Sequence, residues 1–158
     1  SHIIWRGSSF CSMECFKKYR KDKIRRRKIV NWKGEVALKK SLWIVFSKYI
    51  RQRDGGICIS CGKIDYWKNM DAGHYIPKTA GLSIYFDEVN VNCQCTGCNR
   101  FRHGNLTQYA LALQEKYGKD ILKKLDKQRL ETRKISITEY QELIETYKKK
   151  IKDNRFEL

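Results

Sequence analysis

The sequence predicts an α+β chain in which a small zinc-stapled centre is embedded among helices, with a basic N-terminal arm and a helical C-terminal region. Two Cys-x-x-Cys pairs, at residues 58–61 and 95–98, indicate the zinc centre. Apolar residues at three- and four-residue spacing indicate the helices. The formal charge of +17 over 158 residues, with 34 Lys and Arg against 17 Asp and Glu, favours a polyanion such as nucleic acid as partner.

The composition also excludes several classes of protein. A hydrophobic fraction of 41% suffices for one modest core, so we expect a folded chain rather than a disordered one. No stretch approaches the roughly 20 apolar residues of a membrane span, which predicts no membrane partner. The N-terminus has no charged-then-apolar signal pattern, so no secretion is expected.

Basic side chains dominate residues 1–33, which hold eleven Lys or Arg against two acidic residues. The most basic stretch of this arm consists of Arg25, Arg26, Arg27 and Lys28. Such a stretch is too charged to bury, and we interpret it as a solvated helix or arm that docks on phosphates, with a merely solubilising tail as the alternative. Cys11 and Cys15 look like half of an FCS-type zinc finger, so they are either ligands of a second zinc ion or free thiols.

The segment after the arm is expected to begin with an amphipathic helix. Gly34 breaks the preceding pattern, and the helix then covers residues 35–53 until Asp54, Gly55 and Gly56 end it. The elements that follow are a cysteine knuckle at 57–62, a strand at 67–75, a loop at 76–81, and a short strand or turn at 83–86.

The region beyond the second cysteine pair is expected to be helical. Residues 99–103 have room for one helical turn before Gly104. Three helices should follow, at 105–117, 120–130 and 136–152. Asn105 and Gln108 have the form of a capping box for the first of them.

The two Cys-x-x-Cys pairs together can complete a tetrahedral shell for structural zinc, because each pair presents two thiolates from one tight turn. The predicted ligands are Cys58, Cys61, Cys95 and Cys98. The gap of 33 residues between the pairs exceeds that of a compact zinc ribbon. We therefore expect the segment between the two knuckles to carry functional residues. Two buried cysteine pairs or redox-active dithiols are the alternative. Cys93 is left over, as a small buried hydrophobic residue.

Two of the three histidines, His74 and His103, flank the second knuckle. Strand alternation places Asp71 on the same face as Gly73 and places His74 on the opposite face. Asn99 and His103 are four residues apart, so on a helix they would project from one face toward a shared ion.

At this point the sequence resembles a known family. The ordered set of the two cysteine pairs, His74 at a strand end, Asn90, Asn99 and His103 resembles zinc-bracketed HNH nucleases, or ββα-metal fingers. More narrowly, the strings Arg-Gln-Arg-Asp at 51–54, Asp-Ala-Gly-His-Tyr at 71–75 and Gly-Asn-Leu at 104–106 are similar to the NinG (Rap) recombination proteins of lambdoid phages. This resemblance spans roughly residues 35–152.

The resemblance implies an endonuclease that cuts branched DNA, such as Holliday junctions and displacement loops, in the cytoplasm of a phage-infected bacterium. His74 would be the general base that takes a proton from the attacking water, and Asn90 would orient that base or tie the loop. A catalytic Mg²⁺ or Mn²⁺ would be held by Asp71, Asn99 and His103. Many HNH nucleases carry a metal-ligating Asp or His directly before the base. Gly73 stands there in this chain, and Asp71 is the natural substitute.

This interpretation divides the chain into a basic arm with a partial zinc finger (1–33), an HNH-like nuclease domain with flanking helices (34–152) and a tail (153–158). The expected DNA contacts are Arg25, Arg26, Arg27, Lys28, Arg100 and Arg102. The expected protein partners are phage or host recombination proteins and a second copy of the chain. The alternatives are a non-catalytic zinc module that binds nucleic acid and recruits recombination proteins, an unselective HNH nuclease, and a factor directed at RNA.

Overall fold

The structure is a computed structural model that describes residues 3–5, 8–10 and 12–153. The chain divides into two compact units, Ser1–Leu38 and Lys39–Leu158. In the first unit, strands β1 (Ile3–Trp5) and β2 (Ser8–Phe10) pair antiparallel. Cys11 lies outside the described residues, so the hypothesis of a second zinc site at Cys11 and Cys15 stays a prediction.

Helix α1 spans Met13–Arg53, so the predicted break at Gly34 is wrong. Ser12 caps its start, because Ser12 Oγ accepts a hydrogen bond from the Cys15 N–H at 3.3 Å. A glycine costs a helix only about 1 kcal/mol relative to alanine, and Lys and Arg are good helix formers, so Gly34 alone does not stop the helix. The predicted end is confirmed. Gly55 and Gly56 follow with φ of 60° and 69°, and a side chain at Gly56 would overlap the backbone carbonyl of Asp65.

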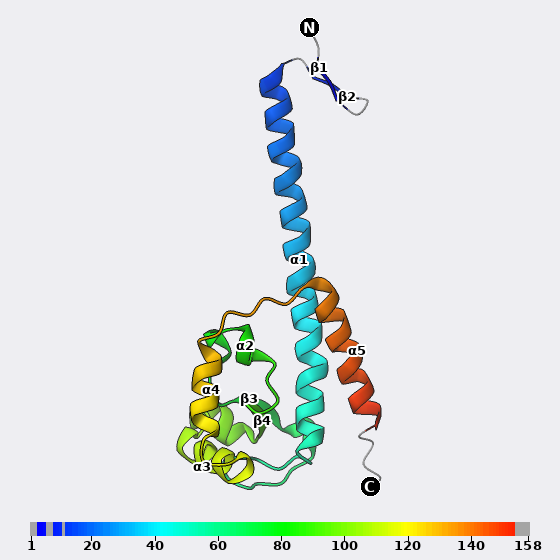
Figure 1. The fold of residues 1–158 in the computed structure, drawn as a ribbon. Coiled ribbons are helices and arrows are strands. Elements are labelled where there is room, and N and C mark those ends of the chain that lie inside the picture. The colour runs from blue at the N-terminus through cyan, green and yellow to red at the C-terminus, as the bar shows by residue number, and fades with distance from the viewer. Residues whose placement is uncertain (1–2, 6–7, 11, 154–158) are drawn as a thin grey trace. The chain divides into compact units, whose positions relative to one another are not determined.

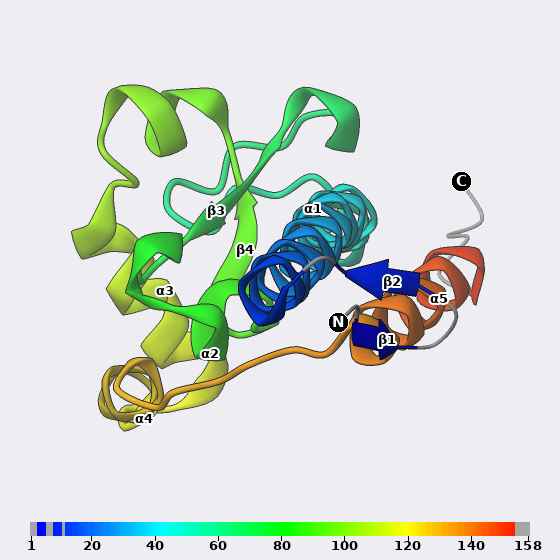
Figure 2. The same ribbon diagram turned by 90° about the horizontal axis from the view of Figure 1, so that it is seen from above.

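The second unit is built around a two-stranded antiparallel sheet of β3 (Asp71–His74) and β4 (Val91–Gln94). In both ribbon views the two strands lie between the C-terminal part of α1 and the helices α3 (Leu106–Tyr117) and α4 (Ile121–Arg129) (Figure 1 and Figure 2). All four residues of β4 are buried. The prediction missed this strand, although its four residues alternate between apolar and polar side chains. Its polar residues, Asn92 and Gln94, are buried as well.

Two segments beside the sheet differ from expectation. The strand predicted over 67–75 is shorter, because Trp67–Asn69 forms a 3-10 helix, η1, of which no residue is buried. The strand or turn predicted over 83–86 is the helix α2 (Leu82–Tyr85). Its position depends on a distant contact, since the Gln128 amide from α4 donates to the Ser83 carbonyl at 2.8 Å. The expected loop 76–81 contains one 3-10 turn, η2 (Lys78–Ala80).

The three C-terminal helices are confirmed as α3, α4 and α5 (Ile137–Asp153). Ser136 caps α5 through a hydrogen bond from the Glu139 N–H at 3.1 Å. The capping box predicted at Asn105 is wrong, because Asn105 adopts a left-handed conformation and makes no side-chain cap bond. Helix α5 packs on α1 where the rings of Phe46 and Tyr147 lie 5.0 Å apart.

Within the ranges that the structure describes, no helix has both the length and the apolar character that crossing a membrane requires.

Candidate functional site

Four cysteine sulfur atoms gather where the two knuckles meet. The Sγ atoms of Cys58, Cys61, Cys95 and Cys98 all lie within 4.8 Å of one another. The Sγ atoms of Cys61 and Cys95 are 3.8 Å apart. This matches the spacing of about 3.8 Å between two sulfurs on a tetrahedral ion with Zn–S bonds of about 2.3 Å. The cluster predicted from the two Cys-x-x-Cys pairs is therefore confirmed as a group that could hold a metal ion such as zinc.

Backbone turns present these sulfurs, and at Cys95 they also favour the ionised form. In the first knuckle the Cys58 N–H donates to the Lys63 carbonyl at 2.8 Å. In the second, the Cys98 N–H donates to Cys95 Sγ at 3.4 Å. Burial raises the pKa of Cys95, but this bond and those from neighbouring thiols outweigh it and lower the pKa to about 7. Cys93 is buried outside the cluster, as predicted.

The cysteine cluster joins the elements that carry the candidate catalytic residues. Strand β4 ends at Gln94, directly before Cys95, and the π-helix η3 (Gly97–Phe101) follows. The Ile59 N–H of the first knuckle donates to the Cys93 carbonyl of β4 at 2.9 Å. A metal ion held by the four sulfurs would therefore fix η3 against the sheet.

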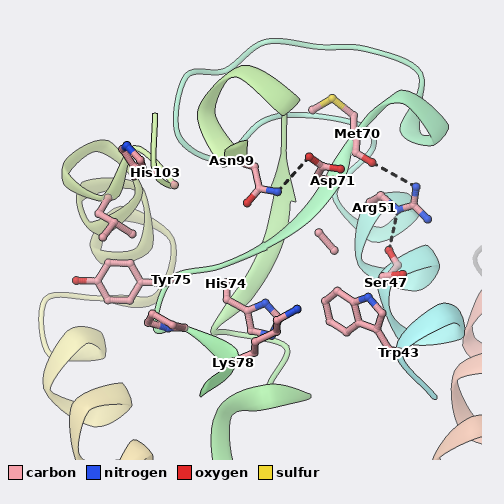
Figure 3. Close-up of a pocket in the computed structure, with 14 residues that line it drawn as sticks. Trp43, Ser47, Arg51, Met70, Asp71, His74, Tyr75, Lys78, Asn99 and His103 are labelled. Atoms are coloured by element: carbon pink, nitrogen blue, oxygen red, sulfur yellow. Dashed lines mark hydrogen bonds between the residues drawn. The ribbon is translucent and has the colours of Figure 1, made fainter. Parts of the chain in front are cut away.

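A pocket of about 570 Å³ opens beside β3, and its lining includes Asp71, His74, Asn99 and His103 (Figure 3). Asp71 and His74 both line it, although alternation was expected to separate them onto opposite faces. Among the strands that the structure describes, β3 pairs only with β4. Two-stranded ribbons twist strongly, so side chains from both faces can border one edge. The strand's alternation therefore does not keep these two residues apart.

His103 lines the pocket from a turn after η3, whereas the prediction placed it on a helix. Helix η3 ends at Phe101, and His103 is exposed with a left-handed φ of 47°. The expectation that Asn99 and His103 project from one helix face is therefore wrong. The π-turn closes when the Arg102 N–H donates to the Gly97 carbonyl at 3.0 Å, which leaves no helical position for His103.

The His74 ring is half-buried and held on three sides. Its Nε2 lies 3.0 Å from the Tyr85 carbonyl oxygen, and because a carbonyl only accepts, Nε2 carries the proton. The Trp43 ring stacks on it at 5.2 Å and 21°, and the Tyr85 ring meets it edge-on at 5.5 Å. Burial lowers the pKa of His74, the Tyr85 carbonyl opposes that shift in part, and the Lys78 charge adds to it. The neutral ring is thus favoured, with Nδ1 as its proton acceptor.

The Asp71 carboxylate is bound by two residues from η3. Arg100 pairs with it through two bonds, from Nη2 to Oδ1 at 2.7 Å and from Nε to Oδ2 at 2.9 Å. The Asn99 amide donates to Oδ2 at 3.0 Å. Burial raises the pKa of Asp71, but these bonds outweigh it and lower the pKa overall. Asp71 is therefore an ionised acceptor in the pocket, while Asn99 Oδ1 keeps its lone pairs.

Asn90 is fully buried and lies outside the pocket lining. Its amide nitrogen donates to the carbonyls of Ile76 at 3.0 Å and Ile84 at 3.1 Å, and its Oδ1 accepts from the Ile76 N–H at 2.8 Å. Of the two expected roles, these contacts support tying the loop after His74. These bonds hold Asn90 to Ile76 and Ile84, and a role of Asn90 in cleavage stays a prediction.

The structure leaves no room for a side chain at Gly73. A Cβ on Gly73 would overlap Gln94 Oε1 and lie 3.0 Å from Asn99 Oδ1. Gln94 is fully buried, and its Nε2 donates to Ser60 Oγ at 2.6 Å and to the Gly104 carbonyl at 2.7 Å. The amide of Gln94 therefore occupies the space that a side chain at Gly73 would need.

Replacing Gly73 with alanine is expected to lower the free energy of unfolding by about 1–3 kcal/mol, because the new Cβ meets a side chain that has no room to retreat. In a Gln94→Ala background the same replacement should cost much less. Urea unfolding of the four chains measures the difference. Gly97→Ala is the matched control, since its Cβ would meet only Cys95 Sγ at 3.8 Å. If Gly73→Ala lowers the free energy of unfolding equally in the wild-type and Gln94→Ala backgrounds, the overlap with Gln94 is not the cause.

Sequence reasoning missed three residues that build the site. Trp43 stacks on His74, and its place outside the apolar helix pattern was the available signal. Arg51 lines the pocket and donates to the Met70 carbonyl at 3.3 Å. Tyr109 is fully buried on α3, and its hydroxyl donates to the Gly73 carbonyl at 2.9 Å. Tyr109 carries no local signal, because only the packing of α3 on β3 brings the two together.

The residues predicted to contact DNA are at the surface of their units. Arg25, Arg26, Arg27 and Lys28 are exposed on α1. Arg102 is exposed, and Arg100, also exposed, pairs with Asp71. Their role toward DNA stays a prediction.

Comparison with known proteins gives consistent matches. The family profile described as "Bacteriophage Lambda NinG protein" matches residues 15–157. "Protein ninG" of Escherichia phage 933W is 33% identical over 142 residues, which cover 85% of this chain and 66% of the relative. The protein of the same name from Escherichia phage lambda is 33% identical over 141 residues (85% and 65%), and that of Salmonella phage P22 is 38% identical over 104 residues (61% and 47%).

The chain thus spans just under two thirds of the length of the 933W relative and a smaller share of the others. No solved structure gives a significant match.

Proposed function

Since the chain belongs to the NinG family of bacteriophage proteins, we propose that it is a metal-dependent DNA endonuclease with a zinc-stapled ββα-metal, HNH-like centre. Its substrates would be branched recombination intermediates such as Holliday junctions and displacement loops. Zinc held by the four cysteines would have a structural role only. Recombination proteins and a second copy of the chain are proposed as protein partners.

The observation that carries this proposal is the state of His74 in the pocket. A general base must be neutral near pH 7 and must have a free lone pair. Burial favours the neutral ring, and the bond from Nε2 to the Tyr85 carbonyl leaves the lone pair on Nδ1. Trp43 and Tyr85 hold the ring plane, so Nδ1 can take the proton of a water molecule as that water attacks phosphorus.

The donor set beside His74 fits a hard divalent cation. Asp71 would supply an ionised carboxylate, Asn99 an amide oxygen and His103 an imidazole nitrogen, and all three line the pocket. Two oxygen donors with one imidazole suit Mg²⁺ or Mn²⁺. Arg100 shares the Asp71 carboxylate through two bonds, and its own side chain is 65% exposed, so a cation that binds Asp71 would have to displace this guanidinium toward solvent. When bound, the cation would neutralise charge on the phosphate and on the leaving 3′ oxygen.

Cleavage of a four-way DNA junction in the presence of Mg²⁺ or Mn²⁺ tests the proposal directly. We expect nicking that needs one of these ions, with linear duplex of matched sequence cut more slowly, because shape and charge rather than base sequence would select the substrate. Gel analysis of end-labelled strands measures both rates. Equal cutting of linear and branched DNA would favour an unselective nuclease. Binding without any cutting would favour the non-catalytic zinc module, for which the Asp71–Arg100 pair is the supporting observation.

A further inference from the structure

An exposed aromatic surface adjoins the candidate cleavage pocket. It is formed by Tyr66 and Trp67, which lie just before β3 and which we call the aromatic platform. The ring centroids are 5.7 Å apart with an angle of 59° between the planes. Tyr66 is 55% exposed, Trp67 is half-buried, and no residue of η1 is buried. Two adjacent large rings that stay partly open to solvent outside the core commonly mark a binding site.

Three cations surround the aromatic platform. Lys48 Nζ lies 5.7 Å and Arg51 Cζ 5.4 Å from the centroid of the Trp67 ring. Lys68 Nζ lies 5.3 Å from the centroid of Tyr66 and 5.6 Å from that of Trp67. The neighbouring acidic residue, Asp65, pairs with Lys63 at 3.2 Å and accepts bonds within its own turn. The rings therefore lie in a positive field beside the pocket.

Arg51 connects the aromatic platform to the pocket. Its guanidinium contacts the Trp67 ring, and its Nη1 donates to the carbonyl of Met70, the residue before Asp71 (Figure 3). Arg51 and Met70 both line the pocket. A DNA strand with its phosphate in the pocket would thus have its neighbouring nucleotides next to Tyr66 and Trp67.

We propose that the aromatic platform binds unpaired nucleotides of DNA, with bases on the Tyr66 and Trp67 rings and phosphates on Lys48, Arg51 and Lys68. Stacking on aromatic rings with cations along the backbone is how proteins hold single strands without reading sequence. Inside a duplex both faces of each base are covered by neighbours, so only an unpaired or unstacked base can use the rings. The platform would favour the open centre of a branched substrate, and this second step rests on the proposed function.

Fluorescence anisotropy with a labelled oligothymidine of about 16 nucleotides tests the first step. We expect Trp67→Ala to weaken binding to the single strand by about tenfold, Tyr66→Ala by a similar factor, and Trp67→Phe by less. Binding to a linear duplex should change less than about twofold in each case. Lys149→Ala, which removes an exposed charge on α5, is the control for charge loss alone.

The salt dependence of binding separates stacking from charge. Lys68→Ala should reduce the slope of log affinity against log salt by about 0.7, whereas Trp67→Ala should leave that slope unchanged. Unchanged affinity of Trp67→Ala for the single strand would overturn the proposal, as would an equal loss of affinity for the single strand and the duplex.

The oligothymidine measurement needs no cleavage, so it tests the aromatic platform separately from the proposed nuclease activity. A chain that cuts no DNA would therefore refute the nuclease but not the platform, and a chain that cuts junctions while Trp67→Ala binds normally would refute the platform alone.

Discussion

His74→Ala is expected to reduce the rate of junction cleavage by about 10²–10⁴-fold, the usual contribution of a positioned general base, while junction affinity changes little. Affinity should survive because the imidazole is neutral and half-buried, so it adds no charge to the surface that meets phosphates. Single-turnover cleavage rates and anisotropy on the same junction measure the two quantities. Loss of binding together with cleavage would show that His74 supports the fold rather than the chemistry.

Two controls separate the base from its surroundings. His74→Gln keeps a side-chain N–H that can reach the position of Nε2 and donate to the Tyr85 carbonyl, but it has no ring nitrogen to accept a proton, so it should be as slow as His74→Ala. Added imidazole should partly restore cleavage by His74→Ala, because the space between Trp43 and Tyr85 is that of the missing ring. Unfolding curves of both variants establish that they fold.

The pH dependence of cleavage follows from the same residue. Burial lowers the pKa of His74 from its ordinary value of 6.5, so the ring becomes protonated at lower pH than an ordinary imidazole. The acidic limb of wild-type cleavage should therefore be centred below pH 6.5. If the cleavage rate instead falls to half its maximum at a pH above 6.5, the general base is a group other than His74.

Removal of zinc is expected to unfold the second unit, because a structural zinc site contributes its binding free energy to folding. Cys58, Cys95 and Cys98 are buried, so without an ion their thiols would be left in the interior with no shared ligand. Cys95→Ala should lose the ion and most of the cooperative thermal transition. Elemental analysis and thermal unfolding, with and without a chelator, measure these effects.

Cys93→Ala is the matched control for the zinc prediction. Cys93 is as deeply buried as Cys58 but lies outside the four-sulfur group. The variant should keep one zinc ion per chain and lose only the packing of one small side chain. Loss of zinc from Cys93→Ala, or full retention by Cys95→Ala, would place the ion elsewhere. Two ions per wild-type chain would instead support the hypothesis that Cys11 and Cys15 hold a second one.

The candidate site was predictable where chemistry depends on residue type and short spacing. Two residues between cysteines suffice to present two sulfurs, so both knuckles could be identified before any fold was known. The string around His74 was specific enough to indicate the family. The relation of Asn99 to His103 was not predictable, because it depended on a π-turn that ends two residues before His103. The conformation of Gly34 within α1 was likewise decided by flanking helix formers rather than by the glycine.

The sequence alone determined the four cysteines that could hold a metal ion, the candidate base His74 and the strong positive charge, since these depend on side-chain chemistry and local spacing. Only the tertiary structure decided the protonated nitrogen of His74, the pairing of Asp71 with Arg100, and the exclusion of a side chain at Gly73. Each of these three depends on an atom far away in the chain or beyond the local turn: the Tyr85 carbonyl, the Arg100 guanidinium and the Gln94 amide. Contacts of this kind exist only after the sheet, the cysteine cluster and the helices have packed together.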